Sequence, residues 1–160
     1  MAKEIKTNAM RILEKNQITF TMYTYECDEF VDGISVVTKL GKPLEQSFKT
    51  LVTQGKSKNY FIFVIPVAEV LDLKKAAAAV AEKSIELIPV KDLTKVTGYI
   101  RGGCTPIGMK KQFQTVVHKS AAEYEKIMIS GGRIGVQIEL NSIDLLKLLK
   151  GTFEDIIIHK

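Results

Sequence analysis

Two glycine-rich segments, residues 98–108 and 130–135, have the residue types and spacing best suited to chemistry in this 160-residue chain. Glycine lets a ligand approach the backbone closely and adopts positive φ, so such segments can present bare N–H groups to an anion or a carbonyl oxygen. The candidate positions are Gly102, Gly103, Ser130, Gly131 and Gly132. A site built from backbone donors is one interpretation, and ordinary turns are the other.

Basic side chains accompany both segments. Lys110 and Lys111 follow the first, and Arg133 lies within the second. Another lysine, Lys49, stands in the apolar run 48–52, where an alternating solvent-facing position would also explain it. Because a lysine ammonium anchors phosphate or hydroxyl oxygens as a point charge, these cations are candidates for binding an anionic substrate.

Cysteine and histidine are scarce. Cys27, Cys104, His118 and His159 show no CxxC or HxxxH spacing, so we expect free thiols, no metal site and no cofactor. One catalytic alternative remains open at this point. Cys104 stands in a glycine-rich setting that could stabilise a thiolate, with His118 as its base.

Size and charge limit the class of protein. The length fits a single domain over residues 1–160, and the formal net charge of +5 weakly favours a polyanionic partner. The longest apolar run, residues 60–65, is too short to cross a bilayer, and the N-terminus lacks the apolar core of a signal peptide. We therefore expect a soluble cytoplasmic protein with no membrane contact.

The elements that must position these residues follow from periodicity and capping signals. Helical spacing predicts helices over residues 5–16, 36–40, 72–83, 92–96 and 141–149, with a helical turn over 121–126. Alternation and β-rich runs predict strands over residues 18–25, 48–52, 60–65, 85–90, 115–117, 127–130, 134–140 and 155–158. Because helices and strands interleave without a regular βα repeat or a linker, one mixed α/β domain is expected.

Several motifs together resemble one family. TYECDEF, FKTL, IPVAEVLDLKKAA, TGYIRGGCTPIGMKK and SGGRIGVQIEL occur in this order. From about Asn8 to the C-terminus the chain resembles the YbaK/EbsC family of free-standing aminoacyl-tRNA editing deacylases, which are similar to the editing domain of bacterial prolyl-tRNA synthetases. The resemblance implies a mixed, partly barrel-like β-sheet flanked by helices, and hydrolysis of cysteine mischarged on proline tRNA.

The resemblance also implies roles for individual residues. The catalytic positions would be Lys49, Gly102 and Gly103. The substrate-binding positions would be Tyr25, Phe30, Ser130, Gly131, Gly132 and Gln137. The tRNA-binding positions would be Lys110, Lys111 and Arg133. The sequence departs from the family at Gln137 and His118, where some relatives carry an acidic residue, so selection of the amino acid is less closely defined than the reaction class.

The mechanism implied by the resemblance needs no Ser-His-Asp set, because the cysteine thiol of the substrate attacks its own ester and leaves as a cyclic thioester. Cys-tRNA(Pro) would be the substrate, with Cys-tRNA(Cys) as another, and prolyl-tRNA synthetase would be a partner. Two alternatives stay open: a deacylase for another small amino acid, and a non-catalytic module that binds tRNA ends or nucleotides.

Overall fold

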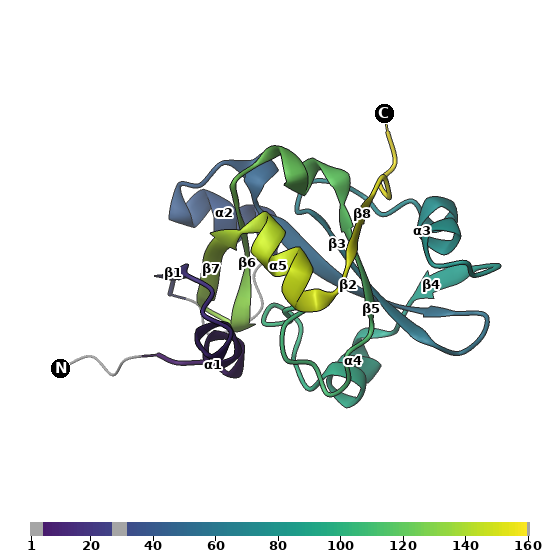
Figure 1. Cartoon of the computed structure of the whole chain (residues 1–160), viewed down its shortest axis with the longest axis horizontal. Coiled ribbons are helices and arrows are strands. Elements are labelled where there is room, and N and C mark those ends of the chain that lie inside the picture. Colours follow the sequence, from purple (N-terminus) through teal and green to yellow (C-terminus); the bar gives the residue numbers. More distant parts are fainter. Residues whose placement is uncertain (1–4, 27–31, 160) are drawn as a thin grey trace.

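The computed structural model describes residues 5–26 and 32–159, which form two β-sheets with helices around them (Figure 1). The smaller sheet has the antiparallel order β1 (Phe20–Thr24), β7 (Val136–Asn141), β6 (Lys126–Arg133). Alternation along β7 divides its two faces, since Ile138 and Leu140 are buried while Gln137 and Glu139 are partly exposed. One face of this sheet therefore belongs to the core, and the other is free to line a site.

The larger sheet is mixed. Its order is β4 (Ile85–Leu87), β2 (Phe48–Gly55), β3 (Tyr60–Pro66), β5 (Gln114–His118), β8 (Thr152–Glu154). The first three strands are antiparallel neighbours, whereas β3, β5 and β8 pair in parallel. Ser47 forms a parallel bridge with Met128, which joins the two sheets. The sheets form an open arrangement that is only partly barrel-like.

Five α-helices and two short 3-10 helices are found in the described part of the chain. They are α1 (Asn8–Lys15), α2 (Gly33–Leu40), α3 (Leu73–Ala79), α4 (Val90–Thr97), α5 (Ser142–Leu149), η1 (Leu44–Gln46) and η2 (Lys119–Glu123). Side-chain oxygens cap four of the α-helices at their N-termini. The caps are Thr7, Asp32, Asp72 and Asn141.

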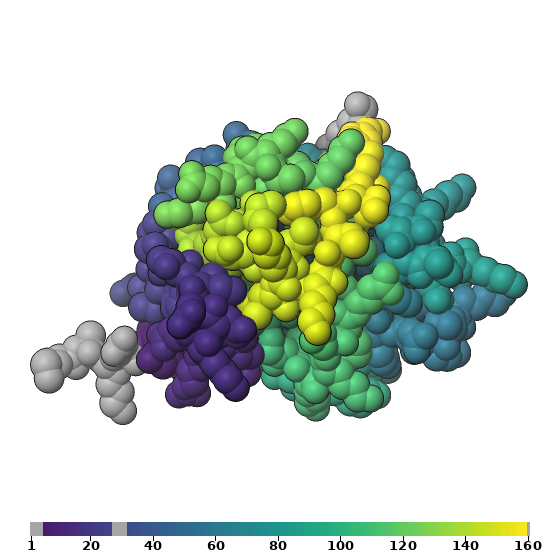
Figure 2. Space-filling model, viewed as in Figure 1, coloured from purple at the N-terminus to yellow at the C-terminus, as the bar shows by residue number. Residues whose placement is uncertain are grey.

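Two apolar clusters fill the space on either side of the larger sheet. Phe61 and Phe63 of β3 face the cluster that contains Ala76 of α3, while Ile62 and Val64 face the cluster shared with α1, α5 and the smaller sheet. Figure 2 shows α5 and the C-terminal segment lying over the middle of one face of the molecule. None of the helices described in residues 5–26 and 32–159 is long and apolar enough to span a membrane.

Most expected elements are confirmed, including the β2–β3 hairpin and the five helices, but two expectations were wrong. The last strand lies at Thr152–Glu154 rather than 155–158, since Ile156 and Ile157 are instead buried against the α3 side of the larger sheet. The second glycine-rich segment is part of β6, which continues to Arg133 with a register shift after Ser130. It is therefore a bulged strand and not a loop.

Candidate active site

A cleft of about 560 Å³ opens between α2, the start of β2, the loop after α4 and the outer face of the smaller sheet. Five residues chosen from the sequence line it: Tyr25, Lys49, Gly102, Ser130 and Gln137. The strand register explains part of this convergence, because Ser130 and Tyr23 both pair with Gln137 and so place these positions in one row across the sheet. Phe30 was also expected here, but it lies outside the described residues, as does Cys27.

Lys49 supplies a positive charge to this cleft. Its side chain is half-buried on β2, and no hydrogen bond or ion pair to the Lys49 ammonium is found within the described residues. Burial lowers the pKa of the Lys49 ammonium, and the nearby Glu69 carboxylate partly opposes that shift. An incompletely solvated cation interacts more strongly with a substrate oxygen than one in bulk water.

The backbone donors differ from one glycine to the next. The N–H of Gly103 donates to the Ile100 carbonyl at 3.0 Å, and the N–H of Gly132 donates to Ser130 Oγ at 3.2 Å. The N–H of Gly102 has no acceptor within residues 5–26 and 32–159, and Gly102 lines the cleft with φ of 88°. Of these glycines, Gly102 is thus the one with a donor still available for a substrate oxygen.

Packing explains why Gly103 and Gly131 lack side chains. A Cβ at Gly103 would lie 3.0–3.1 Å from backbone atoms of Arg133 and Ile134, so the two glycine-rich segments touch directly. A Cβ at Gly131 would lie 2.6 Å from Val136 Cγ1. Gly103, Gly131 and Gly132 do not line the cleft.

Replacing Gly131 with alanine tests this packing argument. The added methyl group overpacks the β6–β7 hairpin, so we expect a loss of about 1–3 kcal/mol in the free energy of unfolding. Denaturant titration measures it. The double variant Gly131→Ala, Val136→Ala should lose less than the sum of the two single variants, because the smaller residue makes room for the methyl group. Strict additivity would contradict the contact.

The loop after α4 is held by its own side chains. Tyr99 Oη donates to the Ile107 carbonyl at 2.5 Å, and burial raises the pKa of Tyr99 to about 12, which keeps the phenol protonated as a donor. The backbone N–H of Tyr99 donates to Thr97 Oγ1 at the end of α4. These contacts fix the base of the loop that carries Gly102 into the cleft.

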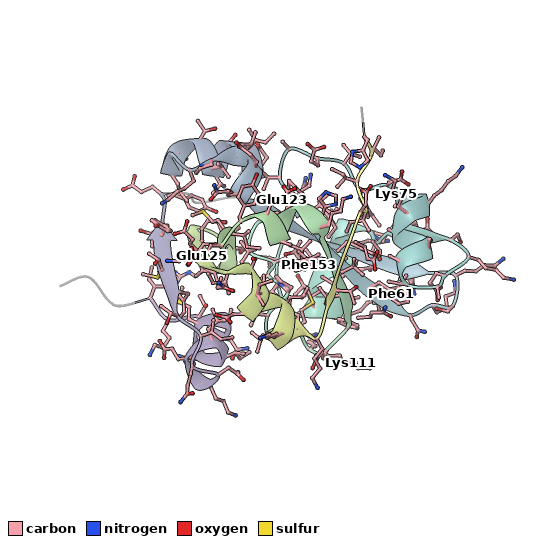
Figure 3. All side chains as sticks on the ribbon, turned by 45° about the horizontal axis from the view of Figure 1, so that its top comes forward. Phe61, Lys75, Lys111, Glu123, Glu125 and Phe153 are labelled. Atoms are coloured by element: carbon pink, nitrogen blue, oxygen red, sulfur yellow. The ribbon has the colours of Figure 1, made fainter. Side chains whose placement is uncertain are left out.

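The remaining basic residues chosen from the sequence do not line the cleft. Lys110 Nζ donates to the Lys95 carbonyl at 3.1 Å, near the C-terminus of α4. Lys111 lines a separate cavity of about 250 Å³, and Figure 3 shows it pointing outward at the edge of the molecule. Arg133 is exposed at the end of β6. Their contact with tRNA stays a prediction.

The structure does not assemble Cys104 and His118 as a nucleophile and base. Cys104 lines the cleft, whereas His118 lines another cavity of about 330 Å³, and its Nδ1 accepts from the Ile156 N–H at 3.3 Å. Burial raises the pKa of the Cys104 thiol to about 12, so little thiolate exists at neutral pH. The hypothesis of a Cys104 nucleophile with His118 as base was wrong, because the two side chains line different cavities. No cluster of three or more potential metal ligands is found among the described residues.

Three residues with polar side chains line the cleft but were not chosen from the sequence, namely Asp32, Thr50 and Arg101. Thr50 adjoins Lys49, and Arg101 adjoins Gly102 inside the segment already chosen for its glycines. Their proximity to chosen residues was the available signal. Asp32 could not be recognised in this way, because an aspartate just before a helical pattern is typical of a helix cap whether or not it also lines a site.

Comparison with known proteins shows the family to which this chain belongs. The sequence profile of the aminoacyl-tRNA editing domain matches residues 32–148, which include Lys49, Gly102, Ser130 and Gln137. The chain belongs to this family. Among curated relatives, this chain is 44% identical over 152 residues to EbsC from Enterococcus faecalis, which is named as a candidate Cys-tRNA(Pro)/Cys-tRNA(Cys) deacylase. The match covers 94% of this chain and 93% of that protein.

Solved structures show the same fold at lower sequence identity. One, described as a candidate trans-editing enzyme for prolyl-tRNA synthetase, superposes on the editing domain with a TM-score of 0.81 at 18% identity, covering 97% of this chain and 100% of that chain. Another, a hypothetical protein, gives a TM-score of 0.83 at 17% identity, with 92% and 97% covered. These similarities confirm the expected editing-domain fold.

Proposed function

We propose that this protein is a cytoplasmic trans-editing hydrolase that deacylates Cys-tRNA(Pro), with Cys-tRNA(Cys) as a second substrate. The observation that carries the proposal is the cleft, which combines the Lys49 ammonium and the Gly102 N–H, while the described residues assemble no protein nucleophile and base there. An aminoacyl ester is already activated. Positioning and charge stabilisation are therefore the main requirements for its cleavage.

In the proposed reaction the substrate supplies the nucleophile. Its Sγ attacks the ester carbonyl carbon and forms a C–S bond, and the carbonyl oxygen becomes an oxyanion. The C–O bond to the ribose then breaks, the thiol proton passes to the departing ribose oxygen, and a cyclic thioester leaves in a lyase-like step. Lys49 and the Gly102 N–H stabilise the oxyanion. Water hydrolyses the thioester afterwards.

The partner proposed for this reaction is prolyl-tRNA synthetase. Support comes from the description of the similar solved structure and from the name of EbsC. The formal net charge of +5 is compatible with binding a tRNA. Tyr25 would lie beside the substrate, where an aromatic ring can stack on a base, and Ser130 and Gln137 would contact the amino acid.

A deacylation panel tests this function. Catalytic amounts of protein are incubated with cysteine, alanine, serine or proline esterified to proline tRNA, with and without the synthetase, and free tRNA is counted per protein molecule. We expect many turnovers with the cysteine ester. Stoichiometric protection of the ester would identify a binding module instead, and turnover confined to another amino acid would identify a different deacylase.

A further inference from the structure

The substrate brings a positive charge into a cleft that already contains one. Lys49 is cationic, and an aminoacyl ester carries a further positive charge on its α-ammonium group. Gln137 offers an amide oxygen but no charge. Within the described residues, Asp32 is the acidic side chain that lines this cleft.

The Asp32 carboxylate is held in one orientation at the N-terminus of α2. Oδ1 accepts from the Ser35 N–H at 3.0 Å, and Oδ2 accepts from Ser35 Oγ at 3.0 Å. The Ser35 backbone hydrogen bond, followed by that of its hydroxyl, holds the pKa of Asp32 below its usual value, so the group is ionised at neutral pH. Since a carboxylate has about four acceptor positions, capacity for another donor remains.

We propose that Asp32 binds the α-ammonium group of the aminoacyl ester and makes this cleft select esters of free α-amino acids. The assignment rests on the proposed function, and it gives Asp32 a second role beside capping α2. The carboxylate offsets the repulsion between the α-ammonium group and the Lys49 ammonium. Gln137 supplies a neutral acceptor from the β7 side.

Asp32→Asn separates charge from capping, because asparagine caps helices as well as aspartate does. Two esters on the same tRNA are compared: cysteinyl, and 3-mercaptopropionyl, which keeps the thiol and ester but lacks the amino group. We expect Asp32→Asn to lower kcat/KM for the cysteinyl ester about 10-fold or more, the usual size of a charge-assisted hydrogen bond. The 3-mercaptopropionyl ester should be cleaved unchanged.

A matched control exists in α3. Asp72 caps that helix by accepting from the N–H groups of Lys74 and Lys75, and it does not line the cleft. Asp72→Asn should leave both esters unaffected. In the Asp32→Asn background, Gln137→Asp should restore part of the preference for the cysteinyl ester, because it returns a negative charge to the cleft.

Binding of the corresponding non-hydrolysable 3′-amides of adenosine gives a readout independent of turnover. We expect Asp32→Asn to raise the Kd of the cysteinyl amide and leave that of the 3-mercaptopropionyl amide unchanged. Equal losses for both amides, or for both esters, would overturn the assignment to the ammonium group. If the wild type cleaves neither ester, the proposed function is contradicted, and the two Kd values still decide the role of Asp32.

Discussion

Replacing Lys49 with methionine is expected to lower kcat/KM for cysteinyl-tRNA by about 100- to 1000-fold, the usual range for losing one group that stabilises an oxyanion. The melting temperature at neutral pH should not fall. Burial lowers the pKa of Lys49, so folding disfavours its charged form, and methionine fills a similar volume without that penalty. Deacylation kinetics and thermal unfolding of the same preparation measure both effects.

The cost of burying the Lys49 charge should depend on pH, and the direction of that dependence provides a test. The folded pKa lies below the unfolded value, so the penalty is present at neutral pH and disappears as pH rises above the unfolded pKa. Any stability gained by Lys49→Met should therefore shrink in strongly alkaline solution.

Lys74, exposed on α3, provides the control for the kinetic effect, since Lys74→Met should leave kcat/KM unchanged. Near wild-type turnover by Lys49→Met would remove Lys49 from the chemistry.

The second large effect concerns the origin of the nucleophile. If the substrate thiol attacks its own ester, cysteinyl-tRNA should be cleaved more than about 1000-fold faster than seryl-tRNA, measured as kcat/KM. Shape alone accounts for less, because a methylene-sized difference in a pocket discriminates by only about 10- to 200-fold. Serine nearly matches cysteine in size. A ratio of the two kcat/KM values beyond that range therefore indicates that the cysteine thiol takes part in the reaction.

The protein's own thiols must be excluded in this comparison. The double variant Cys27→Ser, Cys104→Ala should retain its activity and release a cyclic thioester that can be trapped before hydrolysis. The high pKa of the Cys104 thiol gives the reason, since a protonated buried thiol is a poor nucleophile. Comparable cleavage of the two esters, or inactivity of a folded double variant, would contradict substrate assistance.

The extent to which the site could be predicted differs from residue to residue. Lys49, Gly102 and Gln137 were identified through motifs, and the fold brings them to one cleft although they are far apart in the chain. Gly103 was chosen for the same reason as Gly102, but its N–H donates a hydrogen bond to the Ile100 carbonyl oxygen. Sequence cannot distinguish these two glycines, because hydrogen-bond partners depend on the path of the loop.

The fold was predictable where local signals dominate. The β2–β3 hairpin follows from two β-rich runs around a short polar turn. Asp72 and Asn141 are typical N-cap residues and so predict the starts of α3 and α5. Strand β8 was misplaced because its three residues pair in parallel with β5, a contact that no local pattern encodes. The glycines of β6 resemble a turn in sequence, but they lie in a strand that pairs with β7 through a register shift between Ser130 and Arg133.

The bridge between Ser47 and Met128 joins two sheets that both contribute residues to the cleft. Lys49 lines the cleft from the larger sheet, whereas Ser130 and Gln137 line it from the smaller one, so each sheet alone carries only part of the cleft. A folding intermediate with both sheets formed but separated would have native secondary structure and an incomplete site. The rate at which activity recovers during refolding would therefore report when the two sheets join. The rate at which the circular dichroism signal recovers would report when the strands and helices form.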